Sequence, residues 1–226
     1  MTEHATAALF DIDGTLVDSN YLHIDAWARA FAHLGVAVQS WRIHRCIGMD
    51  SSKLLEELLG DRADTLGSEA GRLHSIYYMQ ASQRLRAFDG ARELLTELAR
   101  RGVTVVLATS APEEELALLR QTLDVEESIA RVTSADDVET AKPDPDIVTV
   151  ALERAQAQSQ HAFFIGDTVW DVAASARAGV ACIGVRSGGI SEAELREAGA
   201  VAVYADVADL LAQLDASPLA ALVTTA

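Results

Sequence analysis

Short apolar runs alternate with amphipathic stretches along most of the chain, most clearly in its second half. The runs have the length of strands, and the stretches between them carry apolar residues at helical spacing. Parallel strands need a helical crossover of about a dozen residues or more, which these spacings supply. The pattern predicts an α/β fold built on a doubly wound parallel sheet. The predicted strands are residues 7–12, 103–108, 131–133, 162–165, 181–185 and 202–204, and the predicted helices are residues 91–101, 113–123, 146–155, 170–178, 192–198 and 207–214.

One segment, residues 20–86, breaks the alternation because it shows helical periodicity without a convincing strand. A first apolar face runs from Trp27 to Leu34 before Gly35, and a second one ends at Leu59. We therefore predict an inserted α-helical domain and a discontinuous main domain. We also expect the last dozen residues to form a frayed tail. The predicted bounds are 1–19 plus 87–226 for the main domain and 20–86 for the insertion.

The composition is that of a globular protein, with 50% hydrophobic and 23% charged residues among 226. This balance excludes wholesale disorder and a miniature disulfide scaffold. Eighteen Lys plus Arg against 34 Asp plus Glu give a formal net charge of −16. Such a surface repels nucleic acids and anionic membranes, and the sequence has no local basic patch. We expect a small diffusible partner, and an anionic one would need a bound cation or a few well-placed Lys and Arg residues.

The two cysteines, Cys46 and Cys182, lie far apart and match no metal-binding spacing, so we expect both to be packing residues. The first residues carry no basic start, and no segment approaches the roughly 18 uninterrupted apolar residues of a membrane span. We expect a cytoplasmic protein that is a monomer or a homodimer.

The first predicted strand leads into Asp11-Ile12-Asp13-Gly14. Alternation along a strand places Asp11 and Asp13 on the same side, so two carboxylates converge at one strand end. Gly14 allows the backbone to turn tightly and approach a ligand closely. The alternative is that these residues only end the strand through ordinary turn chemistry.

Two hydroxyl residues, Thr109 and Ser110, follow the predicted strand 103–108 and precede a helix. Hydroxyls and backbone N–H groups at such a position suit phosphate oxygens, although Ser110 could simply cap the helix. The helix opens with three glutamates, which we expect to complement its dipole and face solvent. These are Glu113, Glu114 and Glu115.

Lys142 follows an acidic loop and precedes Pro143, in a chain that holds few lysines. Its place between a short loop and a proline makes it a candidate anion ligand, with a solvated lysine as the alternative. We expect Asp144 to be the N-cap of the next helix and Pro145 its first residue.

The apolar strand 162–165 is followed by Asp167, and Asp171 comes four residues later. Acidic residues at this spacing repel each other unless a cation or a helix N-terminus offsets the charge. Structural capping by Asp167 is the alternative. Together with Asp11 and Asp13, however, the pair matches the oxygen-rich surroundings that Mg²⁺ prefers.

Ligands of open α/β sheets bind beyond the carboxyl ends of the strands, and all four motifs are expected there. Their chemistry is complementary. Mg²⁺ and Lys142 would neutralise an anion, Thr109 and backbone amides would hold its oxygens, and the first two aspartates would attack and transfer protons.

In this order and spacing, the four motifs resemble those of the haloacid dehalogenase superfamily, in particular its phosphoglycolate phosphatase and β-phosphoglucomutase types. The sequence DIDGTLVDS matches the first motif, Thr109 the second, Lys142-Pro143 the third and GDTVWD the fourth. The resemblance spans nearly the whole chain. It implies a Rossmann-like core, a helical cap inserted after the first strand, and a phosphatase that acts on a small phosphorylated metabolite.

The resemblance also implies a role for each matching residue. Asp11 would form an aspartyl-phosphate, and Asp13 would protonate the leaving oxygen and then deprotonate the hydrolytic water. Thr109, with Ser110 beside it, and Lys142 would hold and neutralise the transferring phosphoryl group.

The metal ion implied by the resemblance is Mg²⁺, held between Asp11 and Asp167. The backbone carbonyl of Asp13 would be a further ligand. Asp171 would be either a ligand or a support for one.

Three residues of the inserted domain are further substrate-binding candidates. His23 lies in YLHIDAW, which resembles the start of the first cap helix in relatives, and Trp27 in the same stretch is expected to be a core residue. Arg45 and Lys53 lie in a segment that resembles the loop closing over substrate. Each of the three candidates could instead be an ordinary polar residue of the surface.

Three other functions compete with hydrolysis of a phosphate ester. A sugar phosphate mutase would carry a lysine soon after Thr109, whereas this chain has Ser110-Ala111-Pro112-Glu113. The same departure also means that this chain lacks a lysine that is common in the second motif of phosphoglycolate phosphatases. A non-catalytic binding module would be expected to lose at least one of the matching residues, and all of them are present. A dehalogenase would not need the acid/base that Asp13 supplies.

Overall fold

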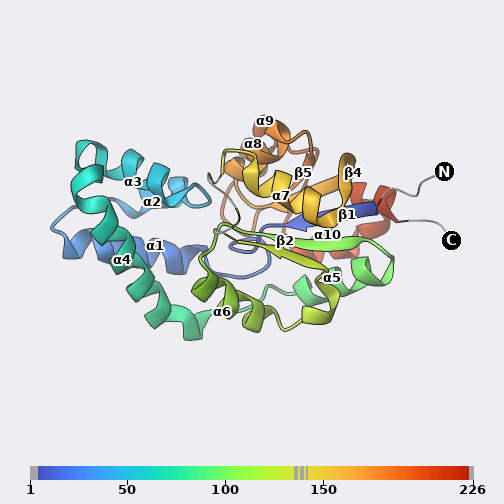
Figure 1. Ribbon diagram of the computed structural model, residues 1–226, viewed down its shortest axis with the longest axis horizontal. Coiled ribbons are helices and arrows are strands. Elements are labelled where there is room, and N and C mark those ends of the chain that lie inside the picture. Colours follow the sequence, from blue (N-terminus) through green and yellow to red (C-terminus); the bar gives the residue numbers. More distant parts are fainter. Residues whose placement is uncertain (1–4, 135–136, 138–139, 141, 224–226) are drawn as a thin grey trace. The chain divides into compact units, whose positions relative to one another are not determined.

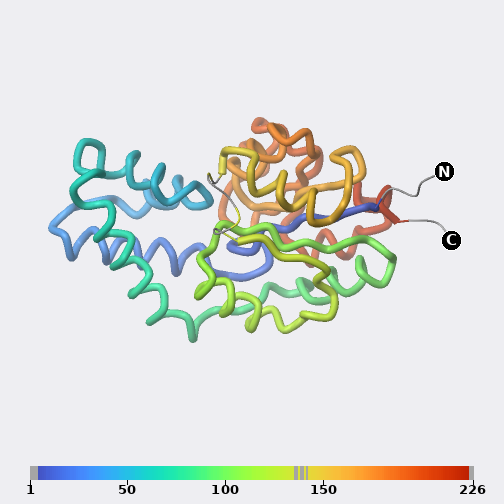
Figure 2. The backbone as a smooth tube through the Cα atoms, in the orientation of Figure 1, coloured from blue at the N-terminus to red at the C-terminus, as the bar shows by residue number. Residues whose placement is uncertain are grey.

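The computed structural model describes residues 5–134, 137, 140 and 142–223. The chain divides into two compact units, which we call the α/β unit (Met1–Asp18 and Arg86–Ala226) and the helical unit (Ser19–Leu85). Figure 2 traces how the chain leaves the α/β unit after its first strand and later returns to it. Each boundary lies one residue before the one expected from the sequence.

The α/β unit is built on a six-stranded sheet in the order β3-β2-β1-β4-β5-β6, with every pair parallel (Figure 1). This confirms the predicted doubly wound α/β fold. The direction of winding reverses between β1 and β4, which is where such sheets bind ligands. The strands are β1 (Ala5–Phe10), β2 (Thr104–Ala108), β3 (Arg131–Thr133), β4 (Ala157–Gly166), β5 (Ala181–Val185) and β6 (Ala202–Tyr204).

Helices cover both faces of this sheet (Figure 1). One face carries α5 (Ala91–Arg100), α6 (Glu113–Leu123) and α10 (Val207–Ala212), and the other carries α7 (Asp146–Ala155), α8 (Val169–Arg177) and α9 (Glu192–Ala198). Because both faces are covered, the central strand β1 is fully buried from Ala7 to Phe10 and consists of apolar residues there.

Strand β4 is longer than the sequence predicts. Its second half, Ala162–Ile165, is the apolar run, whereas its first half is polar and partly exposed. The first half still pairs with β1, since Ala157 lies opposite Ala5 across a register shift. Polar residues at the exposed margin of a sheet give no apolar signal, which is why the pattern missed them.

The expectation of a frayed tail is wrong for most of the last dozen residues. After the short 3₁₀ helix η5 (Leu214–Ala216), a second one, η6 (Pro218–Leu222), packs against β1 and β4. Leu219 and Leu222 are buried, and the Ser217 hydroxyl accepts a hydrogen bond from the Leu219 N–H. Burial of these two leucines outweighs the usual fraying of a chain end.

Two expectations about helix starts are also wrong. The N-cap of α7 is Pro145, not Asp144, and its first helical residue is Asp146. In α6, Glu115 is only 6% exposed instead of facing solvent. Glu115 lies one helical turn before the buried Leu119, so it shares the inner face of the helix.

The helical unit contains α1 (Asn20–His33), α2 (Ser40–Cys46), α3 (Ser51–Leu59) and α4 (Ala63–Ala81), with the short 3₁₀ helices η1 (Gly60–Arg62) and η2 (Ser82–Arg84). Trp27, Phe31, Ile43 and Leu54 belong to a hydrophobic core of its own, and Trp27 is therefore the core residue that the sequence predicts. Gly35 adopts a φ of +69° just after α1 and ends that helix. No helix in the described part of the chain is long and apolar enough to cross a membrane.

Candidate active site

Two buried carboxylates stand at the carboxyl ends of the central strands. Asp11 directly follows β1, and its N–H donates a hydrogen bond to the Ile165 carbonyl at 2.9 Å. Asp167 directly follows β4 and is fully buried. Oxygens of Asp11, Asp167 and Asp171 lie within 4.8 Å of one another. The structure thus brings together three of the four aspartates that the sequence selects.

Lys142 joins this cluster and is not a solvated lysine, since it is 2% exposed. Its Nζ lies 2.7 Å from Asp11 Oδ1 and 2.7 Å from Asp171 Oδ1. Three carboxylates therefore face one ammonium group. These groups give a buried site with a surplus of negative charge, and their carboxylate oxygens are hard ligands. Such a site suits a divalent cation.

Burial and mutual repulsion shift the protonation of these groups. Burial raises the pKa of Asp11 to about 7, against the opposing effect of Lys142, and the charges of Asp171 and Asp13 add to the rise. Burial, with the charges of Asp171 and Asp11, also raises the pKa of Asp167 well above its usual value. Burial lowers the pKa of Lys142, but the two carboxylates beside it outweigh burial and leave that pKa above its ordinary value.

Asp171 has a second partner at the start of α8. Its Oδ2 accepts hydrogen bonds from the Thr168 N–H at 2.9 Å and from the Thr168 hydroxyl at 2.6 Å. The Asp171 N–H in turn donates to the Thr168 hydroxyl at 3.2 Å, which completes a capping box. Since Lys142 occupies Oδ1, both oxygens of Asp171 are engaged. The spacing Thr168-x-x-Asp171 is the sequence signature of such a cap.

Gly166 is required by the close approach of Asp171. A Cβ at position 166 would lie 2.5 Å from Asp171 Cγ, which no side chain tolerates. The glycine before Asp167 is therefore explained by packing against the carboxylate that holds Lys142.

Thr15 is a site residue that the sequence analysis missed. It is fully buried, and its hydroxyl donates a hydrogen bond to Asp167 Oδ1 at 2.9 Å. Asp13, two residues earlier, is half-buried, and its charge acts on Asp11. Thr15 belongs to the quoted motif DIDGT, but only the contact with a strand end 152 positions away reveals its role.

Thr109 and Ser110 lie at the end of β2, the other neighbour of β1. Thr109 is 2% exposed, and its hydroxyl accepts a hydrogen bond from the Ala111 N–H at 3.0 Å. The hydroxyl hydrogen of Thr109 can therefore be donated to a ligand. Ser110 is half-buried and does not cap α6, whose N-cap is Pro112.

The loop that carries Lys142 is tied to α8 by Arg177. The Arg177 guanidinium donates hydrogen bonds to the Pro143 carbonyl at 2.8 Å and to Asp144 Oδ1 at 3.1 Å. Helix α8 therefore contacts the Lys142 side chain through Asp171 and the backbone just after Lys142 through Arg177.

The three substrate-binding candidates of the insertion all lie in the helical unit. His23 is in α1, where its Nδ1 lies 3.0 Å from His74 Nε2 and its ring stacks on Tyr78 at 4.0 Å. Arg45 is exposed near the end of α2, and Lys53 is half-buried in the first turn of α3. Contact of these residues with a substrate stays a prediction.

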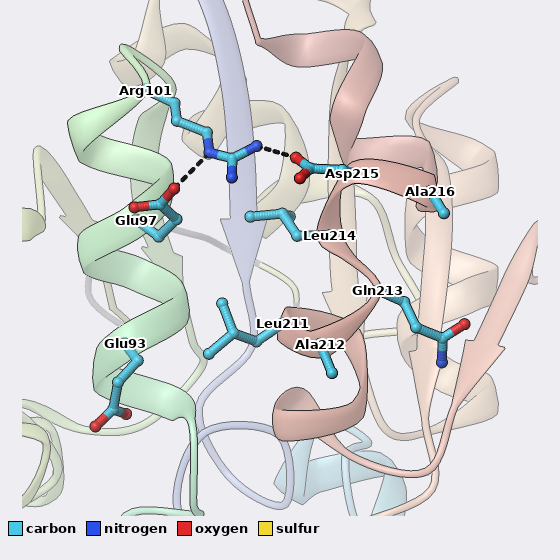
Figure 3. Close-up of a pocket in the computed structure, with 9 residues that line it drawn as sticks. All are labelled: Glu93, Glu97, Arg101, Leu211, Ala212, Gln213, Leu214, Asp215 and Ala216. Atoms are coloured by element: carbon cyan, nitrogen blue, oxygen red, sulfur yellow. Dashed lines mark hydrogen bonds and ion pairs between the residues drawn. The ribbon is translucent and has the colours of Figure 1, made fainter.

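A pocket of about 470 Å³ lies between α5 and the C-terminal segment of the α/β unit (Figure 3). Arg101 spans it, with ion pairs to Glu97 at 2.7 Å and to Asp215. None of the strand-end residues described above lines it. These ion pairs tie the C-terminal segment to α5.

Comparison with known proteins identifies the family. The family model described as haloacid dehalogenase-like hydrolase matches residues 8–185. The chain belongs to this family. The match includes Asp11, Thr109, Lys142 and Asp167, so the family is shown by the part of the chain that carries the site.

Several named proteins are similar to this chain along most of its length. A phosphorylated carbohydrates phosphatase of Thermotoga maritima is 30% identical over 200 residues, which are 87% of this chain and 93% of the relative. A phosphoglycolate phosphatase of Rhodospirillum rubrum is 29% identical over 214 residues, 90% of this chain and 88% of the relative. The crystal structure of a hydrolase from Pseudomonas syringae is 33% identical, with a TM-score of 0.88, and covers 93% of this chain and 98% of that one.

Proposed function

We propose that this protein is a Mg²⁺-dependent phosphatase that hydrolyses a small phosphorylated metabolite through an aspartyl-phosphate on Asp11. The observation that carries the proposal is the buried Asp11 carboxylate, 2.7 Å from the Lys142 ammonium and clustered with Asp167 at the winding reversal of the sheet. The names of the relatives, phosphatases of small phosphorylated compounds, support it.

The residues present fit a magnesium ion. The carboxylates of Asp11 and Asp167, with the backbone carbonyl of Asp13, would hold it. Asp171 holds Lys142 and Thr168 through its two oxygens, and it would be either a further ligand or a support for the lysine. Bound Mg²⁺ would supply charge neutralisation to the phosphoryl oxygens and would favour the ionised form of Asp11.

The protein side of the reaction takes two steps. The Asp11 carboxylate attacks phosphorus, the ester bond breaks, and Asp13 gives a proton to the leaving oxygen. Asp13 then removes a proton from water, which attacks phosphorus and releases inorganic phosphate with regeneration of Asp11. Lys142 and the Thr109 hydroxyl hold the phosphoryl oxygens during both steps, and positioning of this kind is most of what phosphoryl transfer requires.

The helical unit would supply substrate selection. The α/β unit offers groups for the phosphoryl group only, so recognition of the rest of the metabolite has to come from elsewhere. A lid that closes over the ligand and excludes water is a common solution, and His23, Arg45 and Lys53 would face the ligand from it. The proposal includes the cytoplasmic location and the monomeric or homodimeric state expected from the sequence.

Hydrolysis fits better than sugar phosphate mutation. A mutase must hold a second phosphate near the start of α6, but the first turn of this helix carries three glutamates and no lysine. Negative charge at this place disfavours a second anion.

The deciding experiment measures phosphate release from p-nitrophenyl phosphate by the purified protein, with Mg²⁺ and with excess chelator. We expect release with Mg²⁺, loss with chelator, recovery on adding Mg²⁺ back, and a fall of at least about a hundredfold in Asp11→Asn. Circular dichroism of the Asp11→Asn protein controls for folding. Full activity in chelator, or more than about a tenth of the wild-type rate in folded Asp11→Asn, would contradict the proposal.

A further inference from the structure

The loop that follows strand β5 contacts the turn that follows Asp11. The Ser187 hydroxyl, just after β5, donates a hydrogen bond to the Gly14 carbonyl at 2.6 Å. The two residues are 173 positions apart in the chain. This contact connects the β5–α9 loop to the turn between Asp13 and Thr15.

The β5–α9 loop is itself fixed at both ends. The Arg186 N–H donates to the carbonyls of Tyr204 and Ala205, at 3.1 and 3.2 Å, which ties the start of the loop to the end of β6. At the other end, Ser191 caps α9 in a capping box with Glu194. Ser187 directly follows Arg186, so the tie to β6 is the one that holds Ser187, whereas the Ser191 cap lies four residues away at the far end of the loop.

The acceptor side needs such a tether. Gly14 adopts a φ of +73°, and its N–H donates to the Val17 carbonyl at 2.9 Å. The N–H of the peptide after Gly14, which belongs to Thr15, donates to the Ile12 carbonyl at the longer distance of 3.2 Å, and a glycine has the greatest backbone freedom of any residue. The Ser187 hydrogen bond holds the carbonyl of that peptide.

We propose that Ser187 is a positioning residue for the turn that carries Asp13 and Thr15. This inference rests on the proposed function. It touches neither substrate nor metal in this assignment. By fixing the Gly14 carbonyl, it fixes the direction of Asp13 on one side and of Thr15, which holds Asp167, on the other. Acid/base catalysis depends on placement of the carboxyl group within a fraction of an ångström.

The test compares Ser187→Ala and Ser187→Thr in steady-state hydrolysis of p-nitrophenyl phosphate at saturating Mg²⁺. We expect kcat of Ser187→Ala to fall about tenfold with KM changed less than about twofold, because transition-state placement is lost and ground-state binding is kept. Ser187→Thr retains the hydroxyl and is expected to recover most of kcat.

The matched control is Ser191→Ala in the same loop. It removes the capping hydroxyl of α9, so the melting temperature should fall while kcat stays within about twofold of wild type. Hydrogen exchange supplies a readout besides activity. The amides of residues 14–17 should exchange faster in Ser187→Ala than in wild type, and at the wild-type rate in Ser191→Ala.

The outcomes separate the two proposals. An inactive wild-type protein would overturn the proposed function and the positioning role together. An active wild type with unchanged kcat in Ser187→Ala would overturn the positioning role alone, whether or not exchange at 14–17 accelerates. Equal losses in Ser187→Ala and Ser187→Thr would also overturn it, because the hydroxyl would then not be the group that matters.

Discussion

Asp171 links the lysine of the candidate site to the start of α8. One oxygen of its carboxylate accepts from Lys142 and the other accepts from Thr168, so a single side chain starts α8 and orients the lysine. Removing either partner of a buried ion pair leaves an uncompensated charge, which costs about 3–5 kcal/mol. Because Gly166 packs closely against this carboxylate, the geometry around Asp171 is sensitive to an added side chain at position 166.

Gly166→Ala tests this sensitivity. The new Cβ would lie 2.5 Å from Asp171 Cγ, so the carboxylate must move away from Lys142 and Thr168. We expect a loss of about 1–3 kcal/mol in the free energy of unfolding, measured by urea denaturation, together with a loss of phosphatase activity.

Gly71→Ala is the matched control, because nothing lies within 4 Å of a Cβ at this helical position in α4. There the substitution should be neutral or stabilise by up to about 1 kcal/mol. If Gly166→Ala were as stable as the wild type, the present position of the Asp171 carboxylate would not be required for stability.

At the level of elements, α5 and the C-terminal segment are joined by an ionic network. The carboxylate of Glu97 accepts hydrogen bonds from Arg100 and Arg101, and these bonds lower the pKa of Glu97 to about 2. Arg101 continues the network to Asp215 (Figure 3). A carboxyl group whose pKa is lowered by folding stabilises the fold above its unfolded pKa, and this contribution disappears as pH falls toward the folded value.

Glu97→Gln should therefore lower the melting temperature at pH 7, and the difference from wild type should shrink steadily between pH 5 and pH 3. Differential scanning calorimetry across this range measures it. Glu93→Gln, one turn earlier on the same helix, gives the baseline for removing a charge from α5. A difference that is constant with pH would show that Glu97 does not act through its ionisation.

For the whole molecule, the sequence predicts the arrangement of the sheet better than the contacts across it. Strands β3, β5 and β6 have the predicted bounds, because each lies between segments of helical periodicity that limit where a strand can begin and end. Convergence of Asp11, Lys142 and Asp167 follows from parallel topology, since the carboxyl ends of parallel strands share one edge.

The contacts of Thr15 and Ser187 could not be predicted in this way. Each depends on which side chain meets which partner more than 150 positions away, and no local period encodes that. The inward turn of Glu115 was missed for a similar reason, because a glutamate in a first helical turn carries no local sign of burial. Asp171 differs, since the spacing Thr168-x-x-Asp171 is a local signature of the capping box that the structure shows.

The proposed role of the helical unit in substrate selection can be tested at Arg45. If the helical unit binds the part of the metabolite beyond phosphate, Arg45→Ala should lower kcat/KM more for a cap-dependent substrate than for p-nitrophenyl phosphate. The measurement takes the best substrate from a panel of phosphorylated acids and sugars, 2-phosphoglycolate included, and compares the two losses.

The control for Arg45→Ala is Arg72→Ala, an exposed arginine of α4 whose ion pair is with Glu69 on its own helix. It should affect neither substrate. Equal losses on both substrates in Arg45→Ala would place Arg45 outside specificity, and faster hydrolysis of a phosphoprotein than of any small metabolite would contradict the substrate class.

The interrupted α/β unit also sets an order for folding during synthesis. Strand β1 is made first, but its neighbours β2 and β4 lie beyond the whole helical unit in the chain. The helical unit is continuous and has its own core, so we expect it to fold before the strands that pair with β1 have been synthesised. The contact of η6 with β1 and β4 forms after all of these, so the earliest strand of the chain is among the last to be fully enclosed.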